Sequence, residues 1–181
     1  MKLRLFAIMA IMAASALSLT AQKTSVDKFT KSVTTTSDVL RLGYISATVE
    51  DRLSAKEGAS GLFFTYNISD PNFFMINANS HFYILFADGE SVELTNTSFA
   101  VAQKKTLFSA WRLSMTVQIP LEAVEKMAKV PITAVRAEVS ENAISGRSIE
   151  YNIPEKQALK NQKAAERFVM YIDANPVESF L

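Results

Sequence analysis

The sequence predicts a mainly β fold of the α+β type, an antiparallel sheet or a β-sandwich with two helices. Three observations lead to this prediction. Several runs alternate apolar and polar residues with period two and stop at turn-forming residues. Two prolines each precede apolar residues at helical spacing, which predicts a short helix at about 121–129 and an amphipathic C-terminal helix at about 155–173. Strands and helices do not alternate in the way that a parallel sheet requires.

Residues 1–21 predict a secretory signal peptide. Lys2 and Arg4 form a basic start, an uncharged apolar run follows, and the small residue Ala21 stands at its exit. A membrane-spanning helix needs about 20 apolar residues. This run is shorter and contains two serines, so cleavage after Ala21 is favoured over an uncleaved anchor. We therefore expect a single β-rich domain over 22–181 that is periplasmic or secreted.

Composition narrows the classes of function. The chain has no cysteine, which excludes disulfides and a lipid-modified N-terminus. Without the leader, 17 basic residues stand against 18 acidic ones, a net charge of −1. Nucleic-acid binding is not expected, because it depends on clustered Lys and Arg. No second apolar run reaches spanning length, so no transmembrane helix is expected after cleavage.

The first third of the mature chain predicts an entry segment, two strands and a turn. Residues 22–37 are rich in Thr, Ser and Lys and predict an extended entry segment or an edge strand. Residues 39–49 predict the first clear strand, and the polar stretch 51–60 predicts a loop. Alternation returns over 61–68, and Ser69-Asp70-Pro71-Asn72 predicts a turn.

A hairpin is predicted around Asp88-Gly89, a dipeptide that favours tight turns between two strands. Its arms are residues 81–87 and 90–95. The first arm is apolar on both sides, which predicts a central strand covered on two faces.

The register of this hairpin depends on the length of its loop. An even loop would group Tyr83 and Leu85 with the apolar side chains of the second arm. An odd loop with a bulge at Gly89 would group Phe82 and Ile84 with them instead. The sequence leaves both arrangements open.

The last third predicts strands and two helices. Residues 110–119 give the cleanest alternation in the chain, and Pro120 and Pro131 bracket the short helix. Residues 132–139 and 148–153 predict two more strands before the C-terminal helix. The whole chain then holds six to eight strands, with no internal repeat and no sign of a second domain.

Several segments occur in an order that resembles a known group of proteins. They are Val26 to Thr30, the hairpin Phe86 to Gly89, and residues 119–127 followed by 135–138. Together they resemble small exported β-rich proteins of Gram-negative bacteria that have no assigned activity. In that group a short helix precedes a strand of the type seen at 132–136, and a terminal helix closes the domain. The resemblance implies this architecture and contributes no functional residue.

The sequence offers few candidates for catalysis or metal binding. His81 is the single histidine, and no Gly-x-Ser-x-Gly elbow accompanies any serine, so a solvent-facing or backbone-bonded imidazole is expected. With one histidine and no cysteine, no metal site and no cofactor are predicted. Asp88, Glu90 and Glu93 could suggest calcium, but a turn and a solvated strand face explain them better.

Three aromatic residues are the candidate ligand-binding side chains. Phe73 and Phe74 follow the predicted turn, and Trp111 stands at the head of a strand. Such residues can form a platform for sugars or peptides, or they can fill the end of a sandwich core, and the core interpretation is favoured.

We expect a non-catalytic binding or interaction module whose partner is an unknown envelope protein or extracellular ligand. One alternative is a carrier of an apolar ligand, which needs a cavity lined by Phe64, Phe82 and Phe86. The other is a metal-independent hydrolase, which needs two carboxylates brought together by folding. An enzyme is ranked last.

Overall fold

The computed structural model describes residues 22–27, 29–30, 32–54, 60–142 and 145–175. The signal peptide predicted for residues 1–21 lies outside the described residues.

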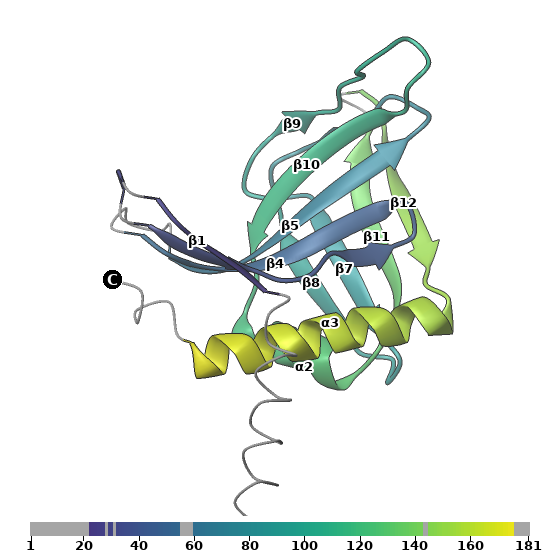
Figure 1. The fold of residues 1–181 in the computed structure, drawn as a ribbon. Coiled ribbons are helices and arrows are strands. Elements are labelled where there is room, and N and C mark those ends of the chain that lie inside the picture. Colours follow the sequence, from purple (N-terminus) through teal and green to yellow (C-terminus); the bar gives the residue numbers. More distant parts are fainter. Residues whose placement is uncertain (1–21, 28, 31, 55–59, 143–144, 176–181) are drawn as a thin grey trace, which may run out of the picture.

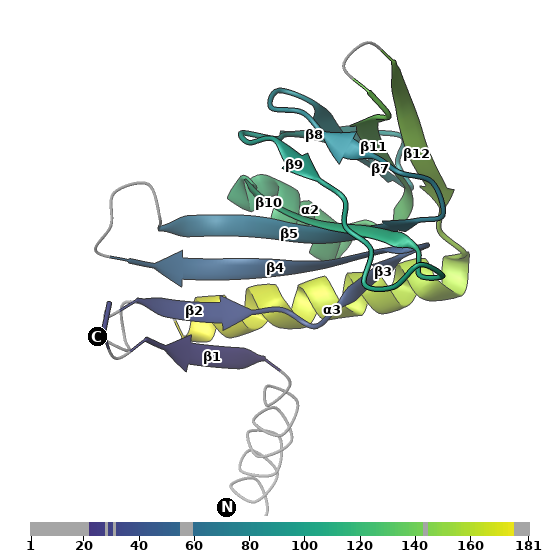
Figure 2. The ribbon, with the colours of Figure 1, turned by 90° about the horizontal axis from the view of Figure 1, so that it is seen from above.

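The described chain forms two antiparallel sheets of six strands and two helices (Figure 1). The strands of sheet A are β1 (Lys23–Val26), β2 (Val33–Thr36), β3 (Leu40–Leu42), β4 (Ile45–Leu53), β5 (Gly61–Asp70) and β10 (Trp111–Gln118). Their order is β1-β2-β4-β5-β10, and β3 also pairs with β4. Figure 2 shows β1, β2, β4 and β5 side by side.

Sheet B is assembled from the later strands. They are β6 (Met75–Ile76), β7 (His81–Phe86), β8 (Ser91–Thr95), β9 (Ala100–Val101), β11 (Ile132–Ser140) and β12 (Gly146–Asn152). The order is β8-β7-β11-β6-β9, with β12 paired to β11. The helices are α2 (Leu121–Lys129) and α3 (Glu155–Ala174).

The two sheets pack face to face around an aromatic core. Phe64 of β5 and Phe82 of β7 are fully buried, and their ring centroids lie 5.5 Å apart. The hydroxyl of Tyr66, also in β5, donates a buried hydrogen bond of 2.6 Å to Asn96 beside β8. Desolvation raises the pKa of this tyrosine far above its usual value. The predicted mainly β fold is confirmed.

The described residues contain more strands than the sequence predicted. The entry segment 22–37 forms a hairpin of two strands, β1 and β2, and the short strands β3, β6 and β9 bring the total in the described residues to twelve, not six to eight. Residues 51–53, expected in a loop, continue β4 and pair with β2 and β5. Short strands carry too few alternations to stand out in a sequence.

The prediction of one strand over 39–49 is wrong. Gly43 and Tyr44 form a two-residue turn, and Leu42 pairs with Ile45 across it. Gly43 has a φ of +77°, and a Cβ at this position would lie 2.6 Å from the ring of Tyr151 in β12. Glycine is therefore required twice, by the left-handed backbone and by the close approach of sheet B.

The hairpin between β7 and β8 has the odd loop. Phe82 pairs with Leu94 and Ile84 pairs with Val92, so these side chains share the buried face. Gly89 takes the positive φ of +85° that closes a three-residue loop. The prediction that β7 is covered on both faces is wrong, because Leu85 on the other face is exposed to solvent.

Both helices lie where the proline signals place them. The short helix has the predicted bounds, and α3 extends one residue beyond the predicted 173. The two helices pack against each other, and α3 lies across one end of the sandwich (Figure 1). We call α2, α3 and the strand ends that they cover the helix end. The opposite end, formed by residues 71–74, 102–110 and 141–142 and the strand ends beside them, is the loop end.

Candidate functional site

The loop end brings two of the three predicted binding residues together. The rings of Phe73 and Trp111 meet edge to face, with centroids 5.0 Å apart, and both residues are partly exposed. Phe74 points the other way and is fully buried in the core. The aromatic pair therefore consists of Phe73 and Trp111, while Phe74 packs the sandwich.

A lysine side chain lies against this aromatic pair. The ammonium of Lys104 lies 4.9 Å from the centroid of the Trp111 ring, within the range of a cation–π contact. Two backbone hydrogen bonds hold the loop in place, from Gln103 N–H to the Arg112 carbonyl (2.8 Å) and from Arg112 N–H to the Gln103 carbonyl (2.9 Å). The site thus combines a flat apolar surface with a positive charge.

An ion-pair network supports the site and joins the two sheets. Asp70, at the end of β5, is 6% exposed and lies 3.1 Å from the guanidinium of Arg147 in β12. The Arg147 Nε lies 2.9 Å from the carboxylate of Glu141. Asp70 also accepts a 2.7 Å hydrogen bond from Asn72 N–H, which fixes the turn that leads to Phe73.

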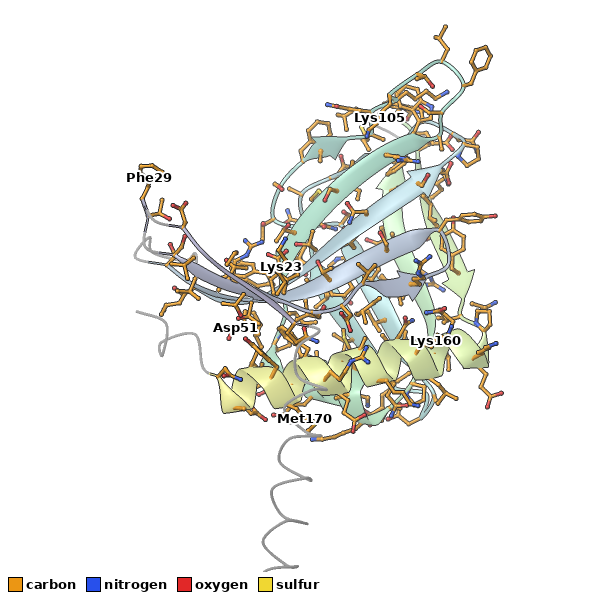
Figure 3. All side chains as sticks on the ribbon, in the orientation of Figure 1. Lys23, Phe29, Asp51, Lys105, Lys160 and Met170 are labelled. Atoms are coloured by element: carbon orange, nitrogen blue, oxygen red, sulfur yellow. The ribbon has the colours of Figure 1, made fainter. Side chains whose placement is uncertain are left out.

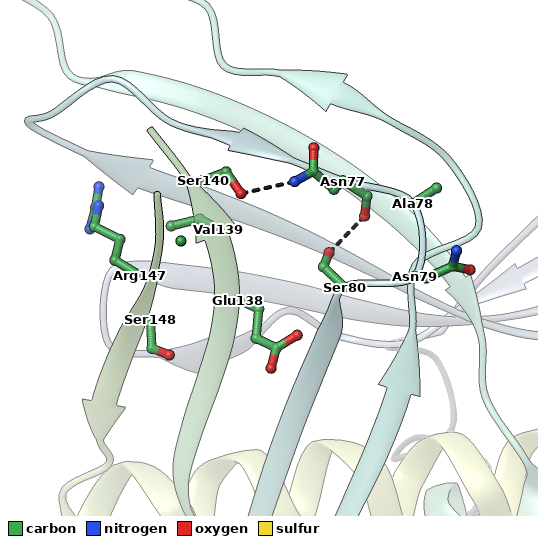
Figure 4. A pocket seen from close by; sticks show the side chains of 10 residues that line it. Asn77, Ala78, Asn79, Ser80, Glu138, Val139, Ser140, Arg147 and Ser148 are labelled. Atoms are coloured by element: carbon green, nitrogen blue, oxygen red, sulfur yellow. Dashed lines mark hydrogen bonds between the residues drawn. The ribbon is translucent and has the colours of Figure 1, made fainter. Parts of the chain in front are cut away.

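A polar depression of about 430 Å³ lies on the sheet B side of the loop end (Figure 4). Its lining is formed by residues 77–80, 138–140 and 146–148. Asn77 donates a hydrogen bond of 2.9 Å to the Ser140 hydroxyl, and Ser80 donates one of 2.7 Å to the Asn77 carbonyl (Figure 4). Amides, hydroxyls and a carboxylate give this surface donors and acceptors for a polar ligand.

His81 and Glu138 have structural partners beside this depression. Glu138 accepts the His81 backbone N–H at 2.8 Å, and the His81 ring nitrogen lies 2.9 Å from the Glu93 carboxylate across the hairpin. Desolvation, together with the charges of Glu138 and Glu93, raises the pKa of Tyr83. The imidazole is partly exposed and pairs with Glu93 of the neighbouring strand, while the adjacent Ser80 hydroxyl donates to the Asn77 carbonyl.

Two of the acidic residues considered as calcium ligands form ion pairs with helix α2 instead. Asp88 and Glu90 both pair with Lys126 of α2, and Asp88 lies 2.9 Å from its ammonium. The hydrogen bond from Lys126 lowers the pKa of Asp88, and the bonds to Glu90 and Asp88 raise the pKa of Lys126. Within the part of the chain that the structure describes, no group of three or more His, Cys, Asp and Glu side chains could hold a metal ion.

The structure adds an exposed apolar tip that the sequence analysis missed. Leu107 and Phe108, in the loop between β9 and β10, are 89% and 99% exposed. The sequence does contain a sign of a positively charged loop. No acidic residue occurs between Glu93 and Glu122, and Lys104 and Lys105 precede the tip. The short apolar pair has no periodicity, and so it does not register in a search for strands or helices.

No helix in the described ranges is long and apolar enough to cross a membrane. Scans of protein-family models and searches of curated proteins and of solved structures found no match. The resemblance to small exported β-rich proteins therefore stays a prediction.

Proposed function

We propose that this protein is an exported, non-catalytic binding module that engages an envelope protein or an extracellular ligand through the loop end. The observation that supports this proposal is the partly exposed pair of Phe73 and Trp111 with Lys104 beside it. Rigid aromatic side chains supply much contact area at a small cost in conformational entropy, and they dominate many binding sites. Export rests on the leader predicted for residues 1–21.

The alternatives have less support from the geometry. A hydrolase needs one carboxylate that can act as base or nucleophile beside an acid. Asp70 and Glu141 instead share the guanidinium of Arg147, and the two acids of the β7–β8 hairpin share Lys126. A carrier needs space beside Phe64, Phe82 and Phe86, yet these side chains are at most 1% exposed and fill the space between the sheets.

Capture from an envelope extract tests the proposal. The protein is immobilised in its wild-type form and as the double variant Phe73→Ala/Trp111→Ala, and the retained material is identified. Phe29→Ala is the matched control, because Phe29 is a highly exposed aromatic residue on the β1–β2 turn, away from the loop end (Figure 3). We expect the double variant to retain at least about tenfold less ligand than the wild type, as for loss of binding hot spots. The control should retain as much as the wild type.

Fluorescence gives an independent readout, because Trp111 is the single tryptophan of the chain. A captured ligand should change its emission in proportion to occupancy. Equal retention by wild type and by the double variant would contradict the proposal. Turnover in a hydrolase screen that survives in the double variant would contradict it as well.

A further inference from the structure

The tip of the β9–β10 loop is built to hold two apolar side chains in solvent. Ser109 N–H donates to the Thr106 carbonyl at 3.1 Å, Thr106 N–H donates to the Ser109 hydroxyl at 3.0 Å, and that hydroxyl donates back to the Thr106 carbonyl at 2.9 Å. These three bonds close a tight turn around Leu107 and Phe108. Burial of such side chains on a second surface is favourable, since it removes apolar area from water.

The loop projects beyond both sheets. In Figure 1 it extends past the ends of β5 and β10, on the side opposite α3, and Figure 3 shows Lys105 on the projecting segment. A flat surface can therefore reach the tip without meeting the rest of the sandwich. Phe99 and Val101, on the chain that leads into this loop, are also exposed.

The charge around the tip is positive. Lys104 and Lys105 stand three and two residues before Leu107, and Arg112 follows in β10. Two acids of the loop end, Asp70 and Glu141, are engaged by Arg147. An apolar pair beside lysines matches a negatively charged surface with an apolar layer beneath it.

These features favour a lipid surface over a protein groove. A typical protein partner buries about 800 Å² on each side, whereas this tip offers two side chains on a four-residue turn. Two such side chains suit the boundary between headgroups and acyl chains, which lies about 5–10 Å deep, and lysines are attracted to anionic headgroups above it.

We propose that residues 104–109 dock this protein on an anionic phospholipid surface, with Leu107 and Phe108 inserted between the headgroups and Lys104 and Lys105 above them. The inference goes beyond the proposed function, because it concerns the loop tip, which shares Lys104 with the site of the Phe73–Trp111 pair but is carried by Lys105, Leu107 and Phe108. The protein then presents its aromatic pair next to a membrane.

Vesicle co-sedimentation tests the inference. The processed protein is mixed with phosphatidylcholine vesicles with or without 40% phosphatidylglycerol. We expect at least about tenfold stronger binding to the anionic vesicles, and a loss of about tenfold or more in Leu107→Ser/Phe108→Ser. Lys105→Gln should weaken binding about fivefold, and binding should fall as salt rises.

Met170→Ser is the matched control, since Met170 is an exposed apolar residue on α3 at the helix end (Figure 3). It should bind vesicles as the wild type does. The melting temperature of the loop variant should equal that of the wild type, because neither side chain packs in the core. This check separates loss of binding from loss of folding.

A fluorescent variant reports insertion directly. In Trp111→Phe/Phe108→Trp the single indole stands at the tip, and its emission should shift to the blue with anionic vesicles and be quenched by brominated lipids. Equal binding to neutral and anionic vesicles, unchanged binding of the loop variant, or capture of a protein through Leu107 without any vesicle binding would each overturn the inference. None of these results changes the retention measured with the Phe73 and Trp111 variants.

Discussion

The two ends of the sandwich are held together in different ways. At the helix end, Asn161 of α3 is 2% exposed; its Oδ1 accepts the Arg41 backbone N–H at 3.0 Å and its Nδ2 donates to the Arg41 carbonyl at 2.8 Å. The side-chain amide thus pairs with β3 as another strand would. At the loop end, the sheets are joined by the ion pair between Asp70 and the partly exposed Arg147. The β9–β10 loop at the same end holds Leu107 and Phe108 in solvent.

This difference separates stability from binding. Buried neutral hydrogen bonds keep their strength at any salt concentration, whereas an ion pair with one partner that solvent reaches is partly screened and contributes less. Further contacts tighten the helix end: Gln162 of α3 donates to the Lys129 carbonyl at the end of α2 at 2.9 Å. We infer that the helix end carries the stability, so that the loop end is free to carry exposed residues.

The largest effect is expected for Asn161→Leu. This change leaves the partly buried N–H and carbonyl of Arg41 without their Asn161 partners, and each lost partner costs about 1–3 kcal/mol. We expect the free energy of unfolding, measured with urea, to fall by about 2–4 kcal/mol. Asn67→Leu, the same substitution at an exposed position of β5, is the control and should change it by less than about 0.5 kcal/mol. An equal loss in both variants would remove the basis of the comparison.

A smaller, salt-dependent effect is expected for Arg147→Met. The change leaves the carboxylate of Asp70 without its cation, but the Arg147 side chain is 26% exposed, so solvent already weakens the pair. We expect a loss of about 1–2 kcal/mol at low salt that shrinks in 0.5 M salt. Arg136→Met removes a more exposed pair with Glu150 and should have no measurable effect. A loss larger than that of Asn161→Leu would reverse the ranking of the two ends.

The smallest effect, visible as a pH dependence, is expected for Lys126→Met. The pKa of Asp88 is lowered from 3.8, so its ion pair stabilises the fold above that pH and is lost as the pH falls through the lowered value. The pKa of Lys126 is raised from 10.5, so its contribution is complete below that pH and is lost as the pH rises through the raised value. The melting temperature of the variant should therefore differ most from that of the wild type between these limits. Lys129→Met, which removes the exposed pair with Glu125, is the control and should show no such window.

The sequence predicted the elements that local chemistry determines. Pro120 and Pro154 marked both helices to within a residue, and the alternation of 110–119 marked β10. The turn at Gly43 was missed although a glycine inside a strand pattern is a recognised sign of a turn or bulge. The order of strands in the sheets could not be predicted, because pairing depends on faces that meet only in the folded chain.

The candidate site was predicted in part. Phe73 and Trp111 were named from their places at a turn and at a strand end, and the structure brings these two together. The sequence could not show which of Phe73 and Phe74 would be exposed. Adjacent residues in extended chain point to opposite sides, and which side faces the core is seen only in the folded backbone. The ion pair of Asp70 with Arg147 joins residues 77 positions apart, and nothing local signals it.

The route of the chain through the two sheets has a consequence for its biogenesis. Trp111 pairs with Asp70, and between them the chain builds β6, β7, β8 and β9 of the other sheet. Sheet A cannot be completed until residue 118 has left the ribosome. Sheet B cannot be completed until β11 and β12 have been synthesised. Pairings this distant in sequence form slowly. A polypeptide that acquires its tertiary structure so late stays without a fold for most of its synthesis, which is compatible with the export that we propose.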